Sequence, residues 1–185
     1  MNSTMIVAAT LLLVGSYAPE IGHKQPAWLD SSISGYLLEG GSEYSSLGVH
    51  DAKTGFFLIR DFECDGAIKS LLLTRDRELV SENGYRVPGY VPRKDYGSDA
   101  RLKNASLRNL STGLGVSIGD PEVKLRKRLG PPTSTKLTGP REQFTECHYR
   151  YQIGKGEDAE INEQTYTFKE GKLIQIEFEY YDGQE

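Results

Sequence analysis

Chemistry-bearing side chains gather in the last strand-like segment of the 185-residue sequence. Glu177 and Glu179 alternate there with apolar residues, and Gln175 precedes them at the same spacing of two. Residues two apart in an extended strand lie on one face, so these side chains would share a polar surface. An earlier alternating segment brings His148 and its neighbours. We predict a partner-binding surface, with a merely solvated face as the alternative, formed by His148, Arg150, Gln175, Glu177, Glu179 and Tyr181.

Catalytic and metal chemistry find little support. Cys147 and His148 are adjacent, with Glu146 before them, which suggests a nucleophile and its base. Neighbouring strand residues point to opposite faces, so this pair cannot work together and we expect no catalytic residue. His23 and His50 have no second His or Cys at ligand spacing. We therefore predict no metal site and no cofactor.

The two cysteines allow two interpretations. In an oxidising compartment, Cys64 and Cys147 could form one disulfide that closes a long loop. Two separate buried thiols are the alternative, because sequence alone does not show whether two cysteines are close enough to join. The sequence leaves both open.

The N-terminus predicts export. The apolar run from Met5 to Val14 is too short to span a bilayer and suits the hydrophobic part of a signal peptide, predicted over residues 1–18. The absence of Lys or Arg before this run and Pro19 after it argue against cleavage, and a buried strand or helix is the alternative. No later run is long enough to span a membrane, so we expect the mature chain in the periplasm or secreted, without a transmembrane segment.

Composition limits the class of partner. Hydrophobic residues make up 37% of the chain and charged residues 26%, which favours a folded protein. The net charge of -4 argues against a general nucleic-acid binder. Basic residues concentrate in 81–128 and acidic residues in 157–185. This polarity would steer a charged partner, unless the two regions offset each other within the fold.

The strand signals are densest in three places. Extended segments are expected at Tyr36–Leu38, at Gly55–Phe62 with Ala67–Thr74 as a hairpin, and as three C-terminal strands, Phe144–Ile153, Gln164–Lys169 and Lys172–Tyr181. A turn at Glu170-Gly171 joins the last two. The two hairpins resemble each other, which indicates either duplication or chance.

One helix has clear start and stop signals. Asp120 is expected as N-cap and Pro121 as the first helical residue, and Gly130-Pro131-Pro132 ends the helix. Leu125 and Leu129 share the face that would cover the sheet. A second short helix is expected near Ala100–Leu110.

These elements predict the organisation of the chain. We expect an α+β fold in which an antiparallel β-meander packs against one or two short helices. If the two hairpins arose by duplication, the fold consists of two tandem diverged units; if their likeness is chance, it does not. The expected parts are a signal peptide (1–18), a linker (19–32), an N-terminal β-rich unit (33–80), a loop or junction (81–112) and a helix-plus-β-meander unit (113–185).

Residues 113–181 carry a short recurring pattern. It runs from Gly115 through Gly119-Asp120-Pro121 into the helix, continues at Leu129-Gly130-Pro131, and ends in the Tyr166–Phe178 hairpin. The pattern resembles the BamE/SmpA-type outer-membrane assembly lipoproteins and the β-lactamase-inhibitory-protein-like domains of exported bacterial proteins. The resemblance implies a domain that binds another protein across its sheet without catalysis. A lipobox cysteine after the apolar run is lacking, which departs from the lipoprotein pattern.

The sequence thus favours one function over two others. We expect an exported, soluble, non-catalytic module that binds another protein of the cell envelope, for envelope assembly or inhibition. A hydrolase-type enzyme with an unrecognised site is the first alternative, and a strongly shifted carboxylate pKa would favour it. A purely structural envelope protein is the second.

Overall fold

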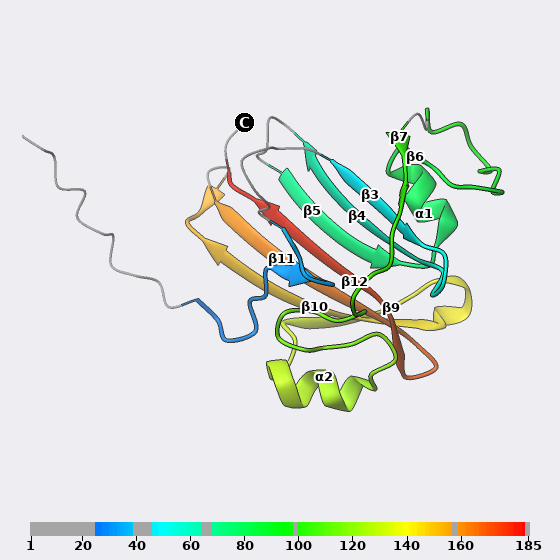
Figure 1. Ribbon diagram of the computed structural model, residues 1–185. Coiled ribbons are helices and arrows are strands. Elements are labelled where there is room, and N and C mark those ends of the chain that lie inside the picture. Colours follow the sequence, from blue (N-terminus) through cyan, green and yellow to red (C-terminus); the bar gives the residue numbers. More distant parts are fainter. Residues whose placement is uncertain (1–24, 39–45, 64–67, 98–99, 157–158, 184–185) are drawn as a thin grey trace, which may run out of the picture.

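One eight-stranded sheet organises the fold (Figure 1). The computed structural model describes residues 25–38, 46–63, 68–97, 100–156 and 159–183. The strands of the sheet are β3 (Leu47–Asp51), β4 (Phe56–Glu63), β5 (Ile68–Thr74), β8 (Lys103–Asn104), β9 (Ser134–Thr138), β10 (Phe144–Ile153), β11 (Glu160–Lys169) and β12 (Lys172–Tyr181). Their order is β8-β3-β4-β5-β12-β11-β10-β9, antiparallel throughout except for the parallel pair β3–β8.

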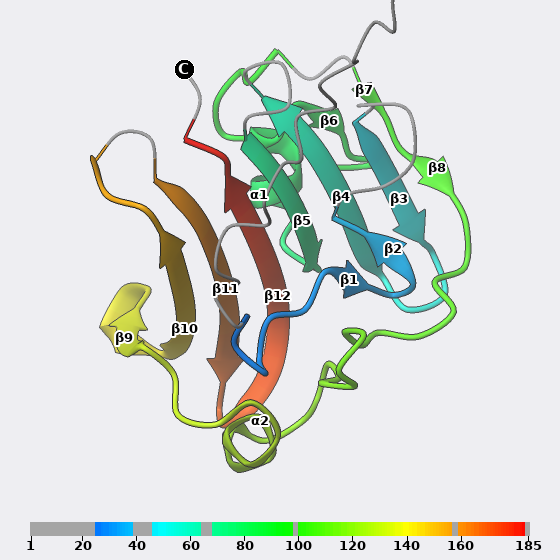
Figure 2. The ribbon, with the colours of Figure 1, turned by 90° about the vertical axis from the view of Figure 1, so that its left-hand side faces the viewer.

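The remaining elements cover the two faces of this sheet. They are β1 (Ser32–Ile33), β2 (Tyr36–Leu37), α1 (Arg77–Glu82), β6 (Tyr85–Arg86), β7 (Ala100–Arg101), α2 (Glu122–Leu129) and the 3-10 helix η2 (Pro140–Glu142). Figure 2 shows the β1–β2 pair and α2 on one side of the sheet and α1 with β6 on the other. We call the side of β1, β2 and α2 the inner face and the side of α1 the outer face.

The predicted α+β fold of a meander packed on short helices is wrong. The described chain is mostly β, with 48% strand and 12% helix. The N-terminal hairpin and the C-terminal meander form one sheet, because β5 pairs along β12 from Ile68↔Tyr181 to Leu73↔Ile176. Joining the two edges satisfies backbone groups that separate sheets would leave open. The two segments predicted as tandem units therefore share one sheet.

The inner face holds the larger hydrophobic core. Tyr149 and Tyr166 are fully buried there, with ring centroids 5.7 Å apart. Leu125 and Leu129 of α2 pack onto this core, as predicted from their spacing. Trp28 lies 5.6 Å from the Tyr149 ring, so part of the predicted 19–32 linker packs on the sheet.

A second core lies on the outer face, over β3–β5. It consists of buried sheet residues and residues of α1 and the segment that follows: Phe57, Ile59, Leu72, Val80, Tyr85 and Val87. Gly48 permits the closest approach, because a Cβ at that position would lie 2.4 Å from the Tyr85 ring. We call this part of the outer face the covered half.

Most predicted strands are confirmed. The bounds of β10 and β12 are those expected from alternation, and Glu170 and Gly171 form the turn between β11 and β12 with φ of 51° and 71°. The helix expected near Ala100–Leu110 is wrong. The first five residues of that segment instead contain β7 and β8, which pair with β6 and β3.

Helix α1 was not predicted, although its signal is present in the sequence. The Asp76 carboxylate accepts hydrogen bonds from the backbone N–H groups of Glu78 and Leu79, the usual role of an N-cap. A helix of six residues is too short for its periodicity to stand out.

The start of α2 differs from expectation by one residue. Pro121 is the N-cap, and Asp120 instead accepts from the Ser117 backbone N–H at 2.9 Å and pairs with Lys124 at 2.7 Å. Asp120 thus fixes the loop before the helix. Because these contacts favour the charged form, they outweigh partial desolvation and lower the Asp120 pKa.

The predictions of a signal peptide and of no transmembrane segment depend on which residues the structure describes. The predicted signal peptide, residues 1–18, lies outside the described residues. Within the described ranges, none of the helices is long and apolar enough to cross a membrane.

Candidate functional site

The outer face changes from apolar to polar along each row of residues that are paired across neighbouring strands. In the central row, Ile59 and Leu72 are followed by Glu177, Thr165 and His148, one residue from each successive strand. The apolar side chains lie in the second core, and the polar ones beyond it reach solvent. We call the outer face of β10–β12 the open half.

Four glutamates meet on the open half. Glu179 lies directly opposite Glu163 in the pairing of β12 with β11, and Glu177 occupies the adjacent row. Partial burial and then the charges of Glu179, Glu146 and Glu163 raise the pKa of Glu177 to about 7. Desolvation and the charge of Glu163 also raise the pKa of Glu179, while His148 lowers it. These carboxylates are held together against their mutual repulsion.

His148 bridges two of these carboxylates. Its Nδ1 lies 3.0 Å from Oε1 of Glu163, and its Nε2 lies 3.4 Å from Oε2 of Glu146. Thr165 Oγ1 is also 3.1 Å from Nδ1. His148 therefore fixes the two carboxylates in position, and a positive charge on its ring would offset part of theirs.

The far end of the open half forms a small hollow. Its volume is about 210 Å³, and Arg150, Glu179 and Tyr181 line it together. Arg150 Nη1 lies 3.8 Å from Oε2 of Glu163, at the edge of ion-pair distance. Aromatic, basic and acidic groups thus converge there, within reach of solvent.

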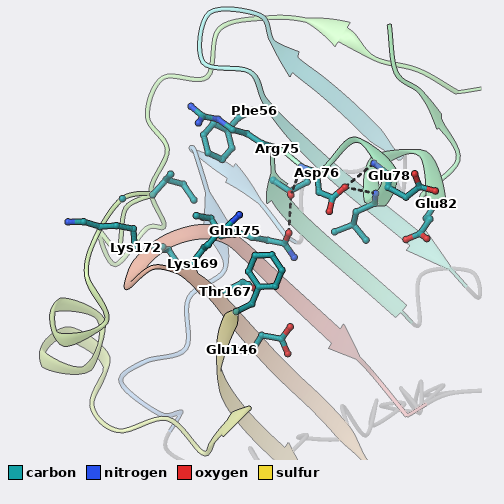
Figure 3. A pocket seen from close by; sticks show the side chains of 17 residues that line it. Phe56, Arg75, Asp76, Glu78, Glu82, Glu146, Thr167, Lys169, Lys172 and Gln175 are labelled. Atoms are coloured by element: carbon teal, nitrogen blue, oxygen red, sulfur yellow. Dashed lines mark hydrogen bonds between the residues drawn. The ribbon is translucent and has the colours of Figure 1, made fainter. Parts of the chain in front are cut away.

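The near end of the open half opens into a larger pocket, shown in Figure 3. The pocket has a volume of about 920 Å³ and lies between the start of α1, the start of β10 and the β11–β12 turn. Gln175 lines it, and its Oε1 accepts a hydrogen bond of 2.9 Å from the Thr74 hydroxyl. Glu146 belongs both to this pocket and to the carboxylate group.

The structure brings all six predicted site residues onto one face. Those on β10 and β12 share it because their spacing of two follows the strand period. Glu163 and the pocket were missed. The position of Glu146 on this face could be predicted, because it precedes His148 by two residues in the same strand. The position of Glu163 beside Glu179 requires the pairing register of β11 with β12.

Cys147 is not part of this site, because its side chain lies on the inner face of β10. Cys147 is fully buried and is a free thiol, with its Sγ 3.8 Å from Glu122 Oε1. Burial and the nearby Glu122 charge raise the pKa of its thiol, so the reactive thiolate is scarce. The prediction that Cys147 and His148 face opposite ways is confirmed. Its proposed disulfide partner, Cys64, lies outside the described residues.

The open half can bind cations through carboxylates but lacks the geometry of a metal centre. Within the described ranges, no group of three or more His, Cys, Asp or Glu side chains could hold a metal ion. The carboxylates together with His148 and Arg150 provide charge complementarity and hydrogen bonding to a ligand.

Comparison of the chain with protein-family models, with curated proteins and with solved structures found no match.

Proposed function

We propose that the protein is an exported, non-catalytic module that binds another protein through the open half of its outer face. The partner contributes lysine or arginine side chains to the carboxylates there. The resemblance of residues 113–181 to exported protein-binding domains and the apolar N-terminal run support the exported, binding character.

The gathering of Glu146, Glu163, Glu177 and Glu179 carries this proposal. Carboxylates so close together repel one another; burial first, and then these neighbouring charges, raise the pKa of Glu177 to about 7. A cationic side chain placed among them removes the repulsion and gains attraction to each carboxylate. Binding would therefore release strain that the free protein retains.

The breadth of the surface favours a protein over a small cation. The polar groups span three strands, from Arg150 on β10 to Glu179 on β12, and the hollow at Tyr181 adds an aromatic contact. A central aromatic or arginine contact with a polar rim is typical of protein interfaces. The alternation of the strands suits an extended basic segment lying across them.

A charge-removal experiment tests the proposal. The probe is a blocked peptide in which lysine and arginine alternate with threonine, and binding is measured by fluorescence anisotropy at two salt concentrations. Glu177→Gln together with Glu179→Gln should weaken binding about tenfold or more, since two charge-assisted contacts are lost. The control pair, Glu170→Gln with Asp95→Asn, removes the same charge from exposed turn and loop positions.

The control separates a site from general attraction. The proposal predicts that the control pair binds the peptide within about twofold of the unaltered protein and that added salt weakens both. Equal losses in both pairs would mean that net charge alone attracts the peptide, which contradicts the proposal. Binding should also strengthen from pH 6 to pH 8 as Glu177 ionises, because its pKa is about 7.

One observation favours a second candidate, a hydrolase. A carboxylic acid with a pKa of about 7 suits a general acid or base at neutral pH, and Glu177 lies near the carboxylates of Glu163 and Glu179. Turnover of nitrophenyl ester, phosphate or glycoside substrates that Glu177→Gln abolishes would favour this candidate. No turnover of any of the three would leave the binding module as the better account.

A further inference from the structure

The pocket at the near end of the open half separates its charges. Figure 3 shows Arg75, Lys169 and Lys172 on one side and the carboxylates of Asp76, Glu78, Glu82 and Glu146 on the other. Lys169 ends β11 and Lys172 begins β12, and Arg75 directly precedes Asp76, the N-cap of α1. The carboxylates belong to α1, its N-cap and β10.

The cations of the pocket have no acidic partner among the residues that the structure describes. The Arg75 guanidinium lies 4.3 Å from the centroid of the Phe56 ring, and the Lys169 ammonium lies 5.6 Å from that of Phe144. Within the described ranges, neither side chain nor that of Lys172 forms an ion pair. Both rings line the pocket, so each stacked cation rests against an apolar surface beside the cavity.

The carboxylates opposite are already engaged. Asp76 caps α1, and Glu146 accepts a hydrogen bond of 2.8 Å from the Thr138 hydroxyl. Glu78 accepts from the Tyr90 hydroxyl, and the Tyr96 hydroxyl, which lies 3.1 Å from both Glu78 and Glu82, shares its one proton between them. Desolvation and these carboxylates raise the pKa of Tyr96 to about 12, so its phenol remains a donor at neutral pH.

The rest of the lining is apolar with a polar floor. The apolar lining residues are Phe56, Leu79, Ile118, Phe144, Leu173 and Ile174. The floor carries Thr74, Thr167 and Gln175, of which Thr74 and Gln175 are hydrogen-bonded to each other. An apolar pocket with a few convergent polar groups is the usual form of an organic ligand site.

We propose that this pocket binds a carboxylate attached to an apolar body. The carboxylate lies between Arg75 and Lys169, and the apolar body rests on the partly exposed lining residues Ile118, Phe144 and Ile174. The unpaired cations select the negative charge, and the engaged carboxylates opposite repel a ligand that projects its charge the other way. This site is distinct from the carboxylate surface proposed for the protein partner, although Glu146 borders both.

A matched pair of ligands tests the charge. The probes are 4-phenylbutyrate and its neutral amide, 4-phenylbutanamide, titrated into the ¹⁵N-labelled full chain and followed by NMR. We expect the acid to shift the amide signals of Lys169–Gln175 and of Ile118–Gly119, and to bind about tenfold more tightly than the amide. Equal affinity of the two probes, or shifts elsewhere alone, would overturn the proposal.

Charge variants assign the binding to the pocket. Lys169→Gln and Arg75→Gln should each weaken phenylbutyrate binding about fivefold or more, and Lys127→Gln on α2 should leave it unchanged. Circular dichroism of each variant checks that the fold is retained. Unchanged binding in both pocket variants would overturn the proposal, whatever the carboxylate surface binds.

A second experiment distinguishes the two kinds of ligand that carry a carboxylate on an apolar body: a peptide C-terminus and a free small carboxylic acid. A blocked tripeptide ending in phenylalanine is compared with its C-terminally amidated form. If the free C-terminus binds more tightly than phenylbutyrate, and amidation removes that binding, the natural ligand is a peptide terminus. If phenylbutyrate binds more tightly, it is a free small carboxylate. Either result supports the pocket, and failure of both acids overturns it.

Discussion

The outer face of the sheet has a covered half and an open half. They differ sharply, although both belong to one sheet and the rows of paired residues run from one into the other. On the covered half, Ile59 and Leu72 are buried beneath α1 and the segment that follows it. On the open half, the same row continues with Glu177, Thr165 and His148, which are only partly buried. The difference shows that α1 and the segment after it cover only the part of the outer face where the sheet residues are apolar. There, burial stabilises the fold. Where the carboxylates gather, the side chains remain accessible to a partner.

A pair of truncations tests this contrast with the largest expected effect. Leu72 is 2% exposed, so Leu72→Ala should lower the free energy of unfolding by about 2–5 kcal/mol. Thr165→Ala, two positions along the same row, should cost about 1 kcal/mol or less, since it removes one partly exposed hydroxyl contact. Urea denaturation of both variants checks the pair. Similar losses at the two positions would mean that the open half is a structural layer after all.

The second prediction is a substitution on the open half that increases the free energy of unfolding. The folded-state pKa of Glu177 is raised from 4.5 to about 7, so its ionisation costs stability as pH rises between those values, and the loss is complete above them. Glu177→Gln should therefore increase the free energy of unfolding at pH 8 by an amount on the order of 2 kcal/mol. The gain should vanish near pH 4, where the carboxyl is protonated.

Denaturation of Glu177→Gln across this pH range, beside Glu170→Gln, measures that effect. Glu170 is exposed in the β11–β12 turn and should show no such pH-dependent gain. A variant at position 177 that is equally or less stable at pH 8 would show that the open half carries no stored repulsion.

The smallest effect concerns the layer of the covered half. Asp76→Ala removes the carboxylate that accepts from the Glu78 and Leu79 backbone N–H groups, and should destabilise the protein by about 1 kcal/mol. Asp76→Asn keeps an acceptor and should cost less. Hydrogen exchange of the α1 amides locates the change, and uniform loss of protection across the sheet would contradict a local role.

Strand period accounts for what the sequence could predict. Alternation gave the bounds of β10 and β12 and placed Gln175, Glu177 and Glu179 on one face, because side chains two apart must point the same way. The spacing of Leu125 and Leu129 likewise predicted the buried stripe of α2. These are local consequences of backbone geometry.

Pairing between distant strands accounts for what was missed. Nothing local in Ile68 or Tyr181 indicates that β5 joins β12, and this one contact turns two expected units into a single sheet. Glu163 lies beside Glu179 in the separate pairing of β11 with β12. It was missed because β11 begins at Glu160, before the expected Gln164, and because the register of this pairing shifts between Thr167 and Phe168. The strands within segment 100–110 were missed because each is two residues long and depends on β3 or β6 for its pairing.

Site-specific photo-crosslinking in the native cell tests the central claim most directly. Benzoylphenylalanine replaces Tyr181 on the open half or, as the matched control, Tyr151 on β10, which lines a different pocket that contains none of Glu146, Glu163, Glu177 and Glu179. The account predicts a discrete crosslinked protein from position 181 alone. Glu177→Gln with Glu179→Gln should abolish it, and the purified captured protein should rebind in a salt-dependent way through a basic surface. A product that forms equally from position 151, or that persists without the two carboxylates, would contradict the account.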